Sequence, residues 1–223
     1  LSEPVWLLFL AGLGLAIWQA FHQRLAWRDL LPVLLWFLLP FAYVVLRRPP
    51  MYDGYRHFLF ILPPVFVFIA LAFQALFERL RRPWVSGLLL AGALLPGLIG
   101  LASLHPYQYT YYNTLAGGTG GAFRSYETDY WLTCYRELMG ELNQTAPAGS
   151  TLFVHRQPSI AQEYAGPGLT VLRYDPDDDQ TFSGSLLLLT TRANVDLVNH
   201  PEAPELLAVG REGAVFCLVR RIP

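Results

Sequence analysis

The chain has no lysine and few charges of either sign. All 16 of its basic residues are arginine, only 15% of its 223 residues are charged, and its formal net charge is −1. The arginines are scattered along the sequence, so no broad positive field of the kind that attracts nucleic acid is expected. We therefore do not expect nucleic acid as a partner.

Cysteine is almost absent as well. Cys134 and Cys217 are the only two, and neither belongs to a CxxC pair, so the sequence suggests no zinc site and indicates no cofactor. The two would form one disulfide if their half of the chain faces an oxidising compartment. Two buried free thiols are an equally good alternative.

Apolar residues, by contrast, are abundant and unevenly placed. The sequence is 53% hydrophobic with a mean hydropathy of +0.32, and most of the excess lies before residue 105. Four runs without interior charge cover residues 4–21, 30–46, 57–77 and 84–104. Helices of this length cross a bilayer core of about 30 Å. We predict a polytopic α-helical membrane region of four spans over residues 1–104.

Prolines interrupt all of these runs except the first. A missing amide donor bends a helix, and the bend is tolerated in a membrane when neighbouring helices cover the freed carbonyl groups. We therefore expect contacts with membrane lipid and with other membrane helices, of the same protein or of a complex. The prolines are Pro32, Pro40, Pro63, Pro64 and Pro96.

The short connections between the runs allow the positive-inside rule to be applied. The first and third connections carry five arginines, whereas the second, which shares its side with residues 105–223, carries three. This excess favours a cytoplasmic side for the first and third connections and an outer side for residues 105–223. The five are Arg24, Arg28, Arg79, Arg81 and Arg82, and the three are Arg47, Arg48 and Arg56.

Residues 105–223 have the mixed composition of a soluble domain. Apolar residues at helical spacing predict an amphipathic helix over 126–144, and two shorter helices are expected near 159–164 and 194–199. Five β-rich segments predict strands, the last two joined by a hairpin turn at 210–213. We predict a small α/β extracytoplasmic domain. The expected strands are 151–155, 169–174, 185–190, 206–209 and 214–221.

Three familiar patterns in this half do not support a functional assignment. The acidic run at 175–180 lacks the glycine and the glutamate of a calcium loop, so a solvated turn is expected. The GGTGG segment at 117–121 follows no strand and ends in no Gly-Lys-Ser/Thr, so a flexible loop is expected. The acceptor pattern at Asn143 often arises by chance.

Three segments in order are more specific together than each is alone. They are YDGYRHFLFILPP at 52–64, HPYQYTYYNTLAGG at 105–118 and GAFRSYETDYW at 121–131. Following several spans, they resemble the C-terminal half of bacterial membrane glycosyltransferases of the protein-mannosyltransferase-like family, glycosyltransferase family 39. The resemblance extends from the second span to the predicted amphipathic helix and weakens after about residue 150.

The resemblance implies a C-type glycosyltransferase fold in a bacterial inner or plasma membrane. It also implies transfer of a sugar, with inversion, from a polyprenyl-phosphate donor to an outer acceptor. Arg56 is then the first candidate for holding the lipid phosphate, because an arginine makes charge-assisted hydrogen bonds to such a group. Tyr52, Asp53 and His57 are further substrate-binding candidates. The structural alternative is an Asp53–Arg56 ion pair at the start of the span.

The second and third segments add His105, Asn113 and Asp129 as candidate substrate contacts. For His105 and Asn113 the favoured alternative is that they fix the chain where it leaves the membrane. For Asp129 the favoured alternative is docking of the amphipathic helix.

The family's catalytic acidic residue lies in a first outer loop that no segment of this sequence matches. The chain also begins at Leu1 without a methionine. We therefore expect a piece of a longer glycosyltransferase that is inactive alone, since loss of a general base costs roughly 10²- to 10⁴-fold. The alternative hypothesis is a non-catalytic membrane scaffold or accessory subunit of a larger complex.

Overall fold

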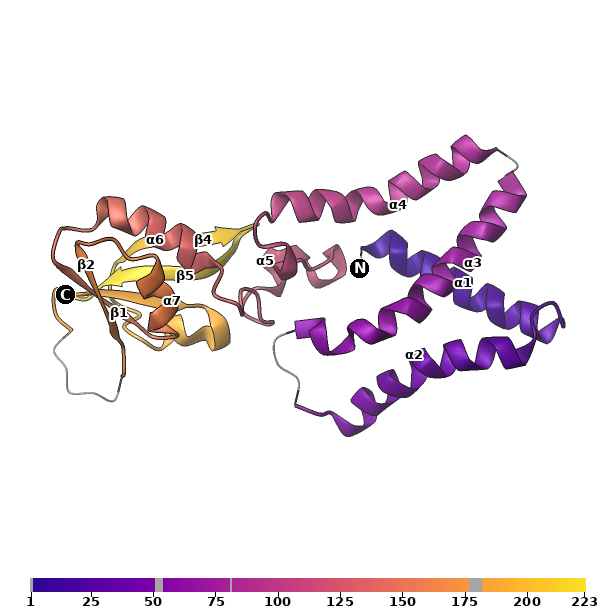
Figure 1. Cartoon of the computed structure of the whole chain (residues 1–223), viewed down its shortest axis with the longest axis horizontal. Coiled ribbons are helices and arrows are strands. Elements are labelled where there is room, and N and C mark those ends of the chain that lie inside the picture. The colour runs from indigo at the N-terminus through magenta and orange to yellow at the C-terminus, as the bar shows by residue number, and fades with distance from the viewer. Residues whose placement is uncertain (1, 51–53, 81, 177–181) are drawn as a thin grey trace. The chain divides into compact units, whose positions relative to one another are not determined.

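The computed structural model describes residues 2–50, 54–80, 82–176 and 182–223 (Figure 1). It divides into two compact units, Leu1–Gly100 and Leu101–Pro223. The division lies four residues before the boundary expected from composition. The two units are called here the helical unit and the α/β unit.

The helical unit contains four helices that are long and apolar enough to cross a membrane, by length and composition. This agrees with the four predicted spans. In the third, a 3₁₀ segment η1 leads directly into an α-helix, and together they make an apolar stretch of 25 residues from Arg56 to Leu80. The elements are α1 (Glu3–Phe21), α2 (Trp27–Arg47), η1 (Gly54–Ile61), α3 (Leu62–Leu80) and α4 (Pro83–Ser103).

The prolines take two different positions in these helices. Pro63 and Pro64 lie in the first turn of α3, where an amide hydrogen has no partner within the helix and proline is readily accommodated. They therefore mark the change from 3₁₀ to α-helix. Pro32 and Pro40 lie inside α2, and Pro96 lies inside α4.

Helix α1 packs against α3 through a stripe of small residues. Gly12, Ala16 and Ala20 follow one another at four-residue spacing and are buried on α1. A Cβ atom on Gly12 would lie 1.7 Å from the carbonyl oxygen of Phe68, so the two backbones approach as closely as only glycine permits. Small residues at this spacing are what membrane helices use for close packing.

The α/β unit is built on one five-stranded sheet in the order β2-β1-β3-β5-β4. Strands β2, β1 and β3 are parallel, whereas β5 is antiparallel to both β3 and β4. All five predicted strands are present, and the small α/β fold is confirmed. The strands are β1 (Ser150–Val154), β2 (Leu169–Arg173), β3 (Leu186–Thr190), β4 (Glu205–Arg211) and β5 (Ala214–Arg221).

Two helices cover one face of this sheet (Figure 1). Helix α6 (Cys134–Thr145) packs on β4 and β5, and α7 (Pro158–Glu163) joins β1 to β2. Their apolar side chains and every second residue of the strands form the main core, which includes Leu138, Leu188 and Val219. A smaller cluster on the opposite face is covered by connecting segments that contribute Phe182 and Ala203.

Three local predictions were wrong in detail. The amphipathic helix begins at Cys134, eight residues later than expected, and residues 126–133 are irregular, with turns at 130–131 and 133. The helix expected at 194–199 is instead η4 (Arg192–Leu197), with non-helical dihedral angles at Ala193 and Asn194. The predicted turn in the acidic run at 175–180 is a separate case, because most of that run lies outside the described residues.

The third wrong prediction concerns the GGTGG segment, which is ordered into the short helix α5 (Gly118–Ala122). Gly117 has φ of 80°, a value that favours glycine, and a Cβ on Gly120 would lie 2.4 Å from the carbonyl oxygen of Glu212. The segment thus needs glycine at position 120 because its backbone packs directly against the turn between β4 and β5. Close packing, and not flexibility, explains this composition.

The α1–α3 contact gives a matched test. Gly12→Leu is expected to lower the midpoint of thermal unfolding of the chain in detergent by several degrees, because overpacking costs about 1–3 kcal/mol or more. Gly14→Leu is the control, since a Cβ on Gly14 meets no atom within 4 Å. Both changes raise helix propensity equally. Equal midpoints for the two variants would contradict the packing described.

Candidate functional site

The residues predicted to hold a lipid phosphate lie at the start of the third apolar stretch. Arg56 and His57 are both exposed in η1, and Nε of Arg56 donates a hydrogen bond to Nε2 of His57 at 3.4 Å. The structure therefore brings these two side chains together. Tyr52 and Asp53 lie outside the described residues, and so does the predicted Asp53–Arg56 ion pair.

His105 and Asn113 lie in the segment that leads from α4 into the α/β unit. The ring Nδ1 of His105 is 2.8 Å from Nε2 of Gln108, on the surface. The side chain of Asn113 accepts a hydrogen bond at 3.3 Å from the amide of Ala116 and so caps the short helix η3 (Thr114–Ala116). Asn113 thus has a local structural role.

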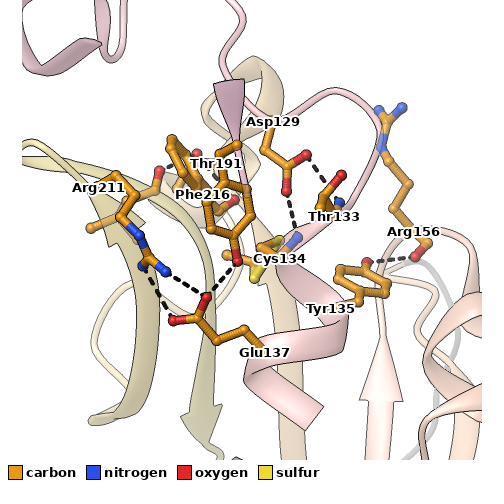
Figure 2. The surroundings of a disulfide bond; sticks show 12 residues. Asp129, Thr133, Cys134, Tyr135, Glu137, Arg156, Thr191, Arg211 and Phe216 are labelled. Carbon is orange, nitrogen blue, oxygen red and sulfur yellow. Dashed lines mark hydrogen bonds and ion pairs between the residues drawn. A yellow bond between two sulfur atoms is a disulfide. The ribbon is translucent and has the colours of Figure 1, made fainter. Parts of the chain in front are cut away.

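Asp129 is buried just before α6, with both carboxylate oxygens engaged (Figure 2). They accept hydrogen bonds from the amides of Thr133, at 3.0 Å, and Cys134, at 2.8 Å, and from the hydroxyl of Tyr109. Burial raises the pKa of Asp129, although these hydrogen bonds oppose the rise. Asp129 therefore starts the helix, because it satisfies amides that have no partner within it.

The cysteines form a disulfide that fixes the same end of α6. Cys134 is the first residue of the helix and Cys217 lies in β5, with 6.1 Å between their Cα atoms. Of the two alternatives open from the sequence, the structure has the bonded pair. The bond joins α6 to an inner strand of the sheet.

Glu137, one turn further along α6, joins three distant parts of the α/β unit (Figure 2). It accepts a hydrogen bond from the hydroxyl of Tyr107 at 2.8 Å and pairs with Arg211 of β4 at 2.8 Å. The guanidinium of Arg211 also lies over the ring of Tyr107, and that ring packs on Phe216. Tyr107 is therefore part of the core and contributes no exposed surface.

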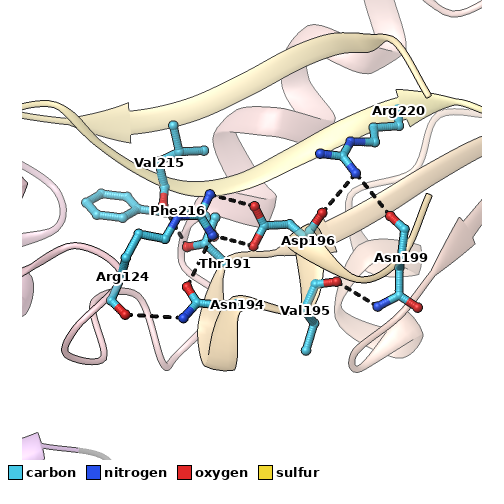
Figure 3. A network of polar contacts seen from close by, with 9 residues as sticks. All are labelled: Arg124, Thr191, Asn194, Val195, Asp196, Asn199, Val215, Phe216 and Arg220. Atoms are coloured by element: carbon cyan, nitrogen blue, oxygen red, sulfur yellow. Dashed lines mark hydrogen bonds and ion pairs between the residues drawn. The ribbon is translucent and has the colours of Figure 1, made fainter. Parts of the chain in front are cut away.

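The third segment of the resemblance, GAFRSYETDYW, lines a hollow of about 190 Å³. Residues 123–128 form one wall, and residues 191–194, which directly follow β3, form the other. Arg124 pairs through both terminal nitrogens with Asp196, at 2.6 and 2.7 Å, and also donates to Asn194 at 3.2 Å (Figure 3). Arg192, in the wall that follows β3, pairs with Glu127 of the other wall at 2.8 Å.

The predicted site residues therefore do not form one cluster within either unit. Arg56 and His57 are adjacent in the helical unit, whereas His105, Asn113 and Asp129 each have separate partners in the α/β unit. Within the described part of the chain, no three His, Cys, Asp or Glu side chains gather closely enough to hold a metal ion.

Reasoning from the sequence did not find the hollow. Arg124 and Asp196 are 72 residues apart, and Arg192 and Glu127 are 65 apart, so neither pair has a local pattern. The one available signal was the density of polar residues in 124–128, next to the aromatic residues of the same segment. No family model, curated protein or solved structure shows a significant match to the chain.

The contacts of Glu137 predict how stability depends on pH. Partial burial would raise the pKa of Glu137, but the hydrogen bonds from Arg211 and Tyr107 outweigh it and the pKa is lowered. Its contribution is therefore present above the ordinary glutamate pKa of about 4.5 and is lost as pH falls through the lower folded value.

We expect the unfolding midpoint of the chain to fall more between about pH 6 and pH 3 than that of Glu137→Gln. Glu141→Gln, which changes an exposed glutamate of the same helix, is the control and should follow the unmodified chain. The midpoints would be measured by circular dichroism. Parallel curves for the unmodified chain and Glu137→Gln would show that this contact contributes nothing.

Proposed function

We propose that the chain is the C-terminal part of a membrane glycosyltransferase. The enzyme would transfer a sugar from a polyprenyl-phosphate donor to an extracytoplasmic acceptor. The proposal rests on the three segments in register and on the four apolar helices that precede the α/β unit. The single observation that carries it is the pair of exposed basic side chains, Arg56 and His57, where the third apolar stretch begins.

The position of Arg56 suits the head of a lipid. A polyprenyl tail would lie among apolar helices while its phosphate stays at the membrane surface, where a side chain at the end of a span is placed. A guanidinium there makes charge-assisted hydrogen bonds to phosphate oxygens, with two of them in parallel when the geometry allows. His57 would add a second donor.

Two observations support an outer location for the α/β unit. The connections assigned to the cytoplasm carry five arginines against three for the other side. The Cys134–Cys217 disulfide belongs to an oxidising compartment, such as the space outside a bacterial inner membrane. The acceptor would then be reached on that side.

A second candidate function, the non-catalytic scaffold, is favoured by the roles of the other motif residues. Tyr107 and Asp129 use their polar atoms to hold the α/β unit together. For this reason, binding of the donor lipid is a sharper readout than turnover.

Arg56→Ala is expected to weaken binding of polyprenyl phosphate to the purified chain about 10- to 100-fold. The reason is that charge-assisted hydrogen bonds contribute about 1.5–3 kcal/mol. Binding would be measured by native mass spectrometry in detergent. Arg28→Ala removes a comparably exposed arginine at the start of α2 and should bind as the unmodified chain does. Equal affinity for Arg56→Ala would refute the phosphate clamp and favour the scaffold.

The outer location predicts the state of the cysteines in the native membrane. Protein denatured directly from intact cells in the presence of an alkylating agent should show no labelled cysteine, because both sulfurs are bonded. Reduction before alkylation should give two labels by mass spectrometry. Labelling of both cysteines without reduction would contradict the assigned side.

A further inference from the structure

The hollow beside Arg124 lies beyond the carboxyl end of β3, in the parallel part of the sheet. From β1 the chain passes through α7 to β2 on one side, and then returns to β3 on the other side of β1. In parallel sheets, ligands bind beyond the carboxyl ends of strands at such a reversal. Residues 191–194 of the hollow follow the carboxyl end of β3 directly, whereas none of the described residues that directly follow β1 is part of its lining, so the hollow lies on the β3 side of this reversal.

The charged groups around the hollow are held in fixed positions. Asp196 is only 1% exposed and holds the Arg124 guanidinium through two parallel hydrogen bonds (Figure 3). The ring centroid of Phe123 lies 4.3 Å from the same guanidinium. Three hydrogen bonds to side chains use three of the five N–H donors of this guanidinium. Its side chain remains 32% exposed. Arg124 therefore offers N–H donors whose orientation is set by these contacts.

The balance of charge disfavours an anion. Each arginine of the hollow is already paired with a carboxylate, Arg124 with Asp196 and Arg192 with Glu127, so the four charges sum to zero. A free phosphate in the hollow would meet the Glu127 carboxylate and two arginines whose charges are already paired. A neutral ligand that both donates and accepts hydrogen bonds suits such a lining better.

The remaining lining is also suited to a polar ligand with one apolar face. Ser125, Thr128 and Thr191 place hydroxyl-bearing residues around the hollow, and Tyr126 at its wall is 62% exposed. An exposed tyrosine ring offers an apolar face with a polar tip. Sugars have this character, since their C–H faces pack on rings while their hydroxyls form hydrogen bonds.

Size limits the ligand further. The hollow of about 190 Å³ is smaller than the sites of about 300–1,000 Å³ that hold drug-sized ligands. We propose that it binds one uncharged sugar unit of the acceptor. That the sugar belongs to an acceptor rests on the proposed glycosyltransferase function, whereas the binding of a neutral sugar rests on the hollow alone.

The test is binding of neutral sugars to the full chain in detergent, by saturation-transfer NMR and titration. The probes are mannose, galactose and N-acetylglucosamine, with inorganic phosphate and mannose 6-phosphate as anionic competitors. At least one neutral sugar should bind saturably. Tyr126→Ala and Ser125→Trp, which remove the ring and fill the hollow, should weaken this binding at least 10-fold.

Tyr164→Ala is the matched control, because Tyr164 is also an exposed tyrosine of the α/β unit but does not line the hollow. It should bind sugar as the unmodified chain does. Circular dichroism would show whether each variant keeps the fold, and both changed residues of the hollow are exposed. Unchanged binding by folded Tyr126→Ala and Ser125→Trp would overturn the proposal. So would saturation by none of the sugars, or stronger binding of phosphate.

The two proposals fail separately. Loss of sugar binding in the hollow variants together with no effect of Arg56→Ala on polyprenyl phosphate would leave a sugar-binding unit and remove the donor site. If Arg56→Ala weakened binding of polyprenyl phosphate but the unmodified chain bound no sugar, the donor site would stand and the proposal of sugar binding in the hollow would be overturned.

Discussion

The start of helix α6 holds the α/β unit together. Within four residues of the sequence, Cys134 is bonded to β5 and Glu137 is bonded to Arg211 of β4. Just before them in the sequence, Asp129 accepts a hydrogen bond from the amide of Cys134. Because the helix is fixed at this end, its buried residues Leu138 and Leu142 are directed onto the sheet and close the main core. The segment that follows α4 is then held by Tyr107, which donates to the same Glu137.

This arrangement separates structural residues from those left for recognition. In the segments 105–118 and 121–131, Tyr107, Tyr109 and Asp129 use their polar groups inside the unit. Tyr126 and the exposed side of Arg124 remain at the surface. These motif segments thus combine residues that hold the fold with residues that stay at the surface, and only their contacts distinguish the two kinds.

Much of the architecture follows from composition and periodicity. Charge-free runs predict the four long helices, and β-rich segments with turn residues between them predict the five strands. The late start of α6 was not predictable from periodicity, because Tyr130 and Trp131 continue the helical spacing although Leu132 has φ of 60°. The helix α5 was not predicted, because the close packing that requires glycine at position 120 is against Glu212, which lies 92 residues further along the chain.

The site was less accessible to such reasoning than the fold. Arg56 and His57 could be chosen from the sequence because they are adjacent and lie beside an apolar run. The hollow depends on two ion pairs whose partners are separated by 65 and by 72 positions in the sequence, and periodicity in the sequence cannot predict such distant pairs. The disulfide stayed one of two alternatives, since 83 residues separate its cysteines and only the sheet brings them to the same place.

The position of β5 in the sheet has a consequence for biosynthesis. This strand lies between β3 and β4, carries Cys217, and is the last strand in the sequence. Strands β1, β2 and β3 emerge from the ribosome earlier, and until β5 arrives β3 has an unpaired edge and α6 lacks its covalent attachment. The α/β unit should therefore fold as a whole only after residue 221 has been synthesised, and until then the edge of β3 is open to pairing with other chains.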